Sequence, residues 1–262
     1  MSKTLTALSA TLAICASASA QVVFETGNDN GFFTPFNAGN AAAVKYGDSG
    51  WLGGPADPPV PLGQITLRLA TFGSATPGTT DIEFTLNNGD PSGLVFGNGA
   101  VLHSTVIAGV QLPAAFGTEA TFFDLVIPLP TVYTTGGYNN VGWSVKCRNY
   151  SYGGSFGFQV GTCTAQTIGY YTNNASFFNG SSWSLFAFGP DTCLNIAQYS
   201  VMIERAACRA DLDGNGRVDG ADLGLLLGAW GPAAGNSADL NGDGFVDGAD
   251  LGLLLGAWGT CP

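Results

Sequence analysis

The side chains best suited to chemistry are oxygen donors that occur twice, at the same spacing, near the C-terminal end of the 262-residue chain. Residues 210–231 and 238–259 match at 19 of 22 positions, with a period of 28 residues. Each copy places Asp or Asn at positions 1, 3, 5, 9 and 12 of a twelve-residue segment, and Gly at position 6. Ca²⁺ prefers six to eight oxygen ligands, and Gly allows the sharp turn that such a loop needs. The sequence therefore predicts two calcium loops, 211–222 and 239–250, that bind two Ca²⁺.

The predicted ligands include one backbone carbonyl per loop. Position 7 contributes that carbonyl, which explains why Arg217 and Phe245 can differ there. Each loop brings four carboxylates around one cation, so we expect it to be loose when calcium is scarce. The predicted ligands of the first loop are Asp211, Asp213, Asn215, Arg217, Asp219 and Asp222, and those of the second loop are Asp239, Asn241, Asp243, Phe245, Asp247 and Asp250.

A short apolar segment follows each loop. Apolar residues recur there at i, i+3, i+4 and i+7, which predicts a helix, with Leu223, Leu226, Leu227 and Trp230 in the first copy. Leu225 and Ala229 make the remaining face apolar too, and a module of about 50 residues has little interior to bury it. Part of this surface should contact a partner, unless the two helices pack mainly on each other. The candidate docking residues are Leu223, Leu225, Leu227, Trp230, Leu251, Leu253, Leu255 and Trp258.

The order of elements in the repeat resembles a known family. The segments before Asp211 and Asp239 are too short or too rich in Gly and Pro for the first helix of an ordinary EF-hand. A calcium loop followed by one helix, twice in tandem with Asp at position 12, resembles the type I dockerin module. The ending Gly259-Thr260-Cys261 is similar to that of GC-type dockerin-anchored exported bacterial proteins.

The resemblance implies a small all-α module that binds two Ca²⁺ and docks onto a cohesin-like receptor on an extracellular scaffold or cell surface. Positions 10 and 11 of the loops hold Gly-Ala, where the family usually has Ser or Thr at the receptor contact. The recognition residues of the family are therefore not transferred to this chain, and a cellulosomal cohesin is not implied.

The N-terminal segment has the pattern of an export signal. Residues 1–20 contain an early Lys3, an apolar run from Leu5 to Ile14, and Ala18-Ser19-Ala20 before the expected cleavage. Later apolar runs are too short to span a membrane. We expect a secreted, extracellular protein, attached to a bacterial cell surface or an extracellular complex.

Cleavage after Ala20 would leave five cysteines in an oxidising compartment. Cys208 and Cys261 flank the repeat, and closing that long loop would stabilise it, so they are the first predicted disulfide. Cys147 and Cys163 flank a Gly- and Tyr-rich stretch and are the second predicted pair, which leaves Cys193 free.

Residues 21–205 form the predicted large domain, followed by the dockerin-like module at 206–262. Within residues 21–205, apolar side chains alternate with polar ones at period two, as in Ile65, Leu67 and Leu69. Turn-forming residues separate nine to eleven such segments, and 39 glycines suit a chain with many turns. The pattern predicts an antiparallel two-sheet β-sandwich, jelly-roll-like in topology.

Catalytic patterns in the large domain are weak. Residues 153–157 match G-x-S-x-G, but a strand-and-turn context and His103 upstream of the Ser do not fit a hydrolase triad. Asp81 and Glu83 have the spacing of a glycosidase pair, although acids on an exposed strand face are ordinary. Aromatic rings in Gly- and Asn-rich segments could stack on sugars or fill the core: Trp51, Tyr150, Tyr152, Tyr170, Tyr171 and Trp183.

The net charge of the chain argues against one class of partner. The formal charge is −11, and 8 of the 19 acids lie in the repeat region, which disfavours a nucleic-acid partner. We therefore predict an exported, non-catalytic β-sandwich that a calcium-loaded module attaches to a surface receptor. The alternative is a component of polysaccharide degradation that binds or hydrolyses glycans.

Overall fold

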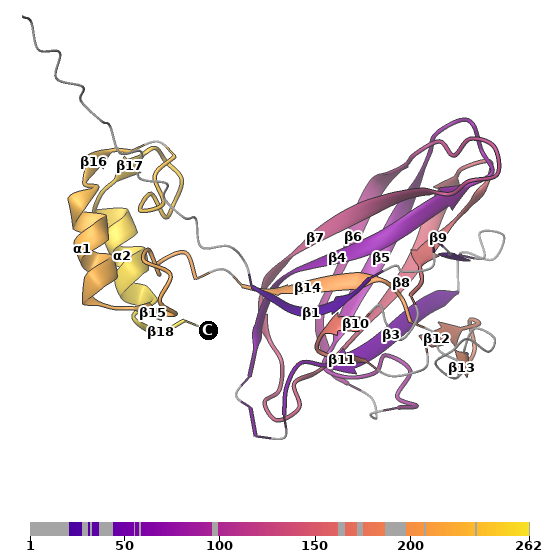
Figure 1. The fold of residues 1–262 in the computed structure, drawn as a ribbon, viewed down its shortest axis with the longest axis horizontal. Helices are drawn as coiled ribbons and strands as arrows, with labels where there is room; N and C mark the ends of the chain where they lie inside the picture. Colours follow the sequence, from indigo (N-terminus) through magenta and orange to yellow (C-terminus); the bar gives the residue numbers. More distant parts are fainter. Residues whose placement is uncertain are drawn as a thin grey trace, which may run out of the picture. The chain divides into compact units, whose positions relative to one another are not determined.

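A computed structural model describes residues 21–27, 31, 33–36, 44–54, 56–57, 59–95, 99–161, 166–171, 175–186, 198–206, 208–233 and 235–261. The chain divides into a large unit, Ala20–Ala206, and a small unit within Ala207–Pro262 (Figure 1). The predicted signal peptide lies outside the described residues. Among the residues described, no helix is both long and apolar enough to cross a membrane.

The large unit is mainly β, as predicted, and its strand pairs are antiparallel. The first sheet has the order β10-β1-β14-β4-β9-β2, and β7 also pairs with β4. Its strands are β10 (Gln166–Ile168), β1 (Val22–Thr26), β14 (Val201–Arg205), β4 (Pro61–Phe72), β9 (Ser155–Gln159), β2 (Phe33–Pro35) and β7 (Thr121–Tyr133).

The second sheet of the large unit has the order β13-β12-β3-β8-β5-β6, and β11 also pairs with β3. Its strands are β13 (Trp183–Phe186), β12 (Ala175–Phe178), β3 (Lys45–Trp51), β8 (Asn140–Ser151), β5 (Gly78–Asn87), β6 (Val101–Leu112) and β11 (Tyr170–Tyr171). Several strands of both sheets have 12 or 13 residues and are longer than the predicted segments.

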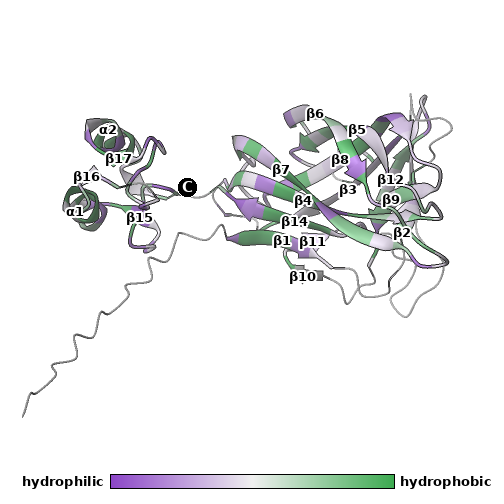
Figure 2. Cartoon of the chain, turned by 90° about the horizontal axis from the view of Figure 1, so that it is seen from above, coloured by the Kyte–Doolittle hydropathy of each residue, from purple (hydrophilic) through white to green (hydrophobic). Residues whose placement is uncertain are grey.

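The two sheets share one hydrophobic core. Every second residue of β5 from Thr80 to Leu86 is buried, including Phe84. On β4, the alternate residues Ile65, Leu67 and Leu69 belong to the same core, and Figure 2 colours these strands by hydropathy. Trp143 of β8 packs edge-on against Phe24 of β1, with ring centroids 5.6 Å apart. Burying each such ring contributes roughly 1.5–3 kcal/mol, so this unit is stabilised mainly by apolar burial.

Cys147 corrects one of the predicted disulfides. It lies on β8 opposite Ile82 and is buried in the core with a free thiol. The predicted pairing with Cys163 is wrong because strand alternation places Cys147 on the same inward face as Val145. Burial raises the pKa of the Cys147 thiol to about 12. Cys163 and Cys193 lie outside the described residues.

The small unit contains two nine-residue helices, α1 (Gly220–Gly228) and α2 (Gly248–Gly256), which contact each other (Figure 1). It also contains two short antiparallel ladders, which the all-α prediction omitted. β15 (Arg217–Val218) pairs with β18 (Gly259–Thr260), and β16 (Gly231–Pro232) pairs with β17 (Phe245–Val246). The ladders form because the chain after each helix runs beside positions 7 and 8 of a predicted calcium loop.

The core of the small unit is minor. It comprises Ala210, Val218, Leu226, Ala238, Leu240, Val246 and Leu254. Helices of this length are marginal alone, so their stability must come from packing and from their caps. Asp219 and Asp247 cap the two helices with the same backbone angles, φ −145° and ψ −159°.

Candidate metal centre

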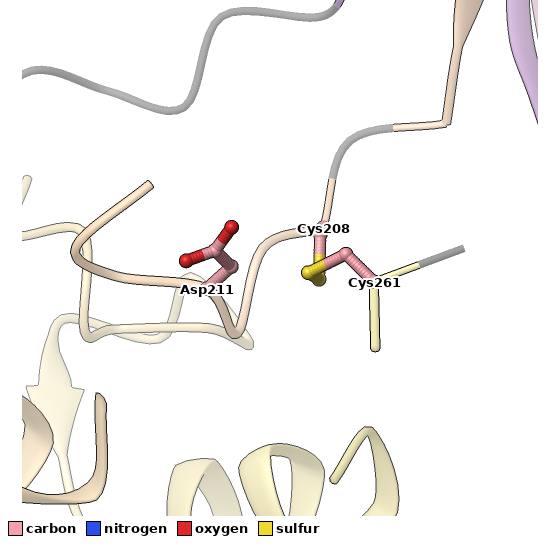
Figure 3. A group of neighbouring side chains, drawn as sticks. All are labelled: Cys208, Asp211 and Cys261. Atoms are coloured by element: carbon pink, nitrogen blue, oxygen red, sulfur yellow. A yellow bond between two sulfur atoms is a disulfide. The ribbon is translucent and has the colours of Figure 1, made fainter. Parts of the chain in front are cut away.

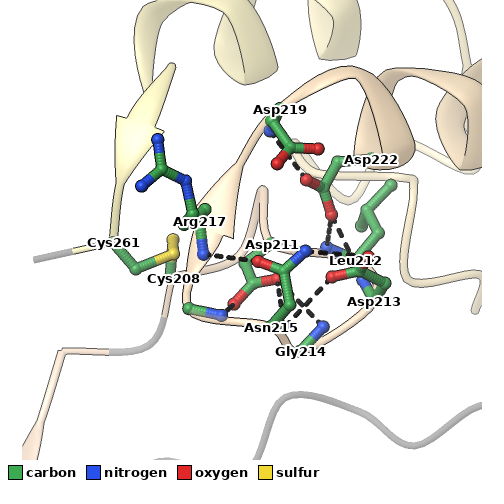
Figure 4. The surroundings of a disulfide bond; sticks show 11 residues. Cys208, Asp211, Leu212, Asp213, Gly214, Asn215, Arg217, Asp219, Asp222 and Cys261 are labelled. Atoms are coloured by element: carbon green, nitrogen blue, oxygen red, sulfur yellow. Dashed lines mark hydrogen bonds between the residues drawn. A yellow bond between two sulfur atoms is a disulfide. The ribbon is translucent and has the colours of Figure 1, made fainter.

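Position 12 of the first predicted loop anchors the whole loop through its carboxylate. Asp222 is fully buried. Its Oδ1 accepts hydrogen bonds from Leu212 N (2.7 Å) and Asp213 N (3.2 Å), and its Oδ2 accepts one from Asp219 N at 2.8 Å (Figure 4). The side chain therefore ties the first turn of α1 to the start of the loop.

Position 1 organises the turn in the middle of the loop. Asp211 Oδ1 accepts from Gly214 N (2.9 Å) and Asn215 N (3.1 Å), and its Oδ2 accepts from Gly216 N at 2.8 Å. Gly216 has φ +86°, a left-handed conformation that explains Gly at position 6. The loop thus wraps around an inward-facing carboxylate.

The second predicted loop repeats this arrangement. Asp250 is also fully buried and accepts from Leu240 N at 2.8 Å and Asp247 N at 2.9 Å. Asp239 accepts from Gly244 N at 2.8 Å, and Gly244 has φ +92°. The pKa of Asp250 is lowered, chiefly by the hydrogen bond from the Asp247 N–H, while burial opposes the shift.

Three carboxylates converge in the first loop. Single oxygens of Asp211, Asp213 and Asp222 lie within 4.8 Å of one another. Position 5 closes the group, because Asn215 Nδ2 donates to Asp213 Oδ2 at 2.9 Å and Asn215 Oδ1 accepts from Arg217 N at 2.8 Å. Asn at position 3 of the second loop, Asn241, donates likewise to Asp243 Oδ2 at 2.9 Å.

The donor set fits a hard dication. The groups that converge are carboxylates, whose oxygens are ligands that Ca²⁺ prefers. Like charges at this separation repel one another unless a cation lies between them. Both ion pairs found among the described residues, Arg68–Glu25 and Arg148–Glu83, belong to the large unit. Among the described residues, the carboxylates of the small unit accept hydrogen bonds from backbone N–H groups and from Asn side-chain amides, and none pairs with a basic side chain.

A second group of residues with metal-binding side chains consists of Cys208, Asp211 and Cys261, but its two cysteines form a disulfide. Cys208 and Cys261 lie beside Asp211, and their sulfur atoms are bonded to each other at 2.08 Å (Figure 3). Sulfur atoms joined in this way are not thiolates and cannot act as thiolate ligands. This bond matches the first predicted disulfide and joins the two ends of the small unit, 53 residues apart.

The candidate docking residues divide into two groups. Leu223 and Leu251 pack against the small core. The other six side chains are about half exposed, from 49% for Leu225 to 52% for Leu255: Leu225, Leu227, Trp230, Leu253, Leu255 and Trp258. A groove of about 540 Å³ borders α1, lined in part by Gly224, Leu225 and Gly228.

The weak catalytic candidates of the large unit have structural partners. Asp81 accepts from Gly109 N (2.8 Å) and Asn149 Nδ2 (2.6 Å), which lowers its pKa, and Glu83 pairs with Arg148. Ser155 begins β9 of the first sheet, whereas His103 lies on β6 of the second sheet. These residues therefore do not form an evident catalytic group.

The aromatic residues that are candidates for sugar binding differ in their packing and exposure. Tyr150 donates to Gly154 O at 2.6 Å and packs, like Tyr152 and Tyr171, against the core. Trp183 packs on Phe178 within one β-hairpin. Trp51 and Tyr170 stack at a centroid distance of 5.5 Å, and Tyr170 is 59% exposed.

Sequence reasoning missed Asp48, a fully buried acid on β3. It accepts from Ser49 N (2.8 Å) and Tyr199 N (2.9 Å), so it attaches the segment before β14 to the second sheet. Burial raises its pKa well above the usual value. An acid in the middle of the strand sequence KYGDSGW was the available signal.

Comparisons with known proteins add little. No family model matches the chain, and no curated protein matches it. A solved structure titled "Structure of infectious bursal disease virus Gx strain" aligns with a TM-score of 0.23 and 14% identity, over 77% of this chain and 45% of that chain. The chain thus spans less than half the length of that match, and a likeness this low supports no conclusion on fold or function.

Proposed function

We propose that the small unit is a dockerin-like module that binds two Ca²⁺, one in each loop, and attaches an exported β-sandwich to an extracellular receptor. The observation that carries the proposal is the convergence of Asp211, Asp213 and Asp222, with the same fold of loop around Asp239 and Asp250. Carboxylates gathered without a described basic partner call for a cation of high charge.

In the proposed site, the chain supplies side-chain oxygens from positions 1, 3, 5, 9 and 12 and a carbonyl from position 7. Bound Ca²⁺ would neutralise the repulsion between the carboxylates and thereby stabilise the loop and its helix. The amides that already hold Asp211 and Asp222 orient these carboxylates before the ion binds.

The receptor, in this proposal, is a cohesin-like surface protein that contacts the exposed apolar side chains of α1 and α2. Leu225, Trp230 and their counterparts are half exposed on a unit of about 50 residues, and such patches are typical of protein interfaces. The Cys208–Cys261 disulfide supports an oxidising, extracellular location. The large unit, as a two-sheet sandwich sharing one core, would be the attached cargo.

Attachment to cells tests the proposal. The purified full chain should bind to the surface of its source cells in calcium and be released by a chelator. The double variant Asp211→Ala, Asp239→Ala should fail to bind, whereas Glu119→Ala, which removes an exposed acid from the large unit, should bind normally. Equal attachment of all three proteins with and without calcium would reject the proposal.

Glycan binding is the second candidate function, and one observation favours it. The stacked rings of Trp51 and Tyr170 leave Tyr170 exposed, and a flat exposed ring suits a sugar face. A glycan array and a reducing-sugar assay on the full chain would detect binding or hydrolysis. Glycan binding or hydrolysis that Tyr170→Ala abolishes would support this function. No binding and no hydrolysis in the two assays would reject it.

A further inference from the structure

The 28-residue repeat extends, in three dimensions, to the residues that flank each loop. Cys261 N donates to Gly216 O at 2.9 Å in the first repeat, and Ala233 N donates to Gly244 O at 2.9 Å in the second. Position 261 is therefore the counterpart of position 233, 28 residues earlier. Each of these residues continues a short strand, β18 or β16, that pairs with positions 7 and 8 of a proposed calcium loop.

The residues that lead into the loops correspond in the same way. Asp211 N donates to Cys208 O at 3.0 Å, and Asp239 N donates to Asn236 O at 3.1 Å. Cys208 is thus the counterpart of Asn236. The two disulfide cysteines occupy the positions that Ala233 and Asn236 occupy around the second loop.

The covalent connection between these paired positions differs between the repeats. Around the second loop, Ala233 and Asn236 are three residues apart in the chain, and Asn236 N donates to Ala233 O at 2.8 Å, the hydrogen bond of a peptide turn. Around the first loop, positions 208 and 261 belong to opposite ends of the small unit, with Cα atoms 5.7 Å apart. The disulfide joins them where the chain does not.

We propose that the Cys208–Cys261 disulfide replaces, at the first loop, the peptide turn 233–236 of the second loop, and so closes the small unit into a ring with two equivalent calcium loops. The calcium affinity of the first loop then depends on the disulfide, and that of the second loop does not. This inference rests on the proposed function, because it assigns a role at the two proposed calcium sites.

The physical reason is the cost of bringing chain ends together. Without the disulfide, the end of the chain is held to the first loop by the two-residue ladder of β18 with β15 and by the hydrogen bond from the amide of residue 261 to Gly216 O, so strand and loop can separate. Calcium binding must then also order the end of the chain, which lowers the apparent affinity of the first loop. The second loop keeps its peptide turn and therefore its affinity. We expect a loss of about tenfold or more at the first loop alone.

Calcium titration of the full chain tests the asymmetry. Asp239→Ala reports on the first loop and Asp211→Ala on the second. Adding Cys208→Ser with Cys261→Ser should weaken calcium binding about tenfold or more in the Asp239→Ala protein, and less than about twofold in the Asp211→Ala protein. Equal losses at both loops, or no loss at either, would overturn the inference.

Cleaving the peptide chain beside the second loop is the matched control for removing the disulfide beside the first loop. A protease site inserted between Ala234 and Gly235, cleaved in the oxidised protein, breaks the peptide turn and leaves the disulfide as the covalent link. Calcium binding should now weaken at the second loop and persist at the first. Weakening at the first loop instead would contradict the proposed equivalence.

Hydrogen exchange in chelator separates failure of this inference from failure of the proposed function. The amide of position 261 should exchange faster in the double cysteine variant, while the amide of Ala233 should not change. If no protein binds calcium, the proposed function fails, and this exchange result still decides the role of the disulfide. Unchanged exchange at position 261 would reject that role.

Discussion

The large and small units of this chain are stabilised in different ways. The large unit buries apolar side chains from both sheets in a single core that includes Trp143, Phe158 and Tyr199. The small unit has a seven-residue core, and its buried Asp222 and Asp250 each hold backbone N–H groups of a loop. The difference indicates that the large unit depends on hydrophobic packing, whereas the small unit depends on carboxylates, a disulfide and the proposed ions.

The largest stability effect should come from truncating the core of the large unit. Trp143→Ala should lower the free energy of unfolding of that unit by about 3–5 kcal/mol, because it removes a fully buried ring and leaves a cavity. Chemical denaturation monitors the change, and calcium binding by the small unit should be unaffected. Phe116→Ala is the control, since Phe116 is 71% exposed. A similar loss in both variants would contradict the account.

Removing a buried carboxylate should affect the small unit instead. Asp222→Ala should weaken calcium binding at the first loop by more than about 100-fold, because it removes a proposed ligand and three hydrogen bonds. The unfolding midpoint of the large unit should not shift. Retention of both calcium sites in this variant would show that position 12 does not bind the ion.

The buried Asp48 should make the large unit less stable as the pH rises, the opposite of the effect of an acid whose pKa is lowered by folding. Its pKa in the folded protein is raised by burial, so the folded state holds its proton more tightly than the unfolded state does. Its contribution is present below the unfolded pKa and is lost as the pH rises toward the folded pKa. The stability of the wild type minus that of Asp48→Asn, measured by denaturation at several pH values, should fall across this window. A rising difference would refute the assignment.

The smallest stability effect is expected at the proposed docking surface. Leu225→Ser with Leu253→Ser should change the stability of the small unit by less than about 0.5 kcal/mol per site, because both side chains are half exposed. Cell attachment should nevertheless be lost. Leu226→Ala, in the small core, should destabilise the unit by about 2–4 kcal/mol. Normal attachment by the double serine variant would place the receptor contact elsewhere.

The sequence predicted local features of the small unit well. The turn at Gly216, which has a positive φ, the helix after each loop, and the pairing of Cys208 with Cys261 follow from residue types within and beside a short repeat, and the calcium ligands stay a prediction. The two ladders were missed because they join the end of each helix segment to a loop, and no periodic pattern marks strands of two residues.

In the large unit, alternation predicted the inward faces, such as Leu67 on β4, but not the order of the strands. β4 pairs with β7, β9 and β14, and these partners are chosen by packing between distant segments. The same long-range packing buries Cys147 and Asp48, so neither the free thiol nor the buried acid could be inferred from neighbouring residues.

Calorimetric titration of the full chain with Ca²⁺ tests the central claim most directly. The wild type and Glu119→Ala should bind two ions per chain, Asp211→Ala and Asp239→Ala one each, and the double variant none. Circular dichroism on the same samples should show that helical signal grows as the wild type binds calcium. Absence of binding in the wild type, or a stoichiometry that the Asp variants leave unchanged, would contradict the account.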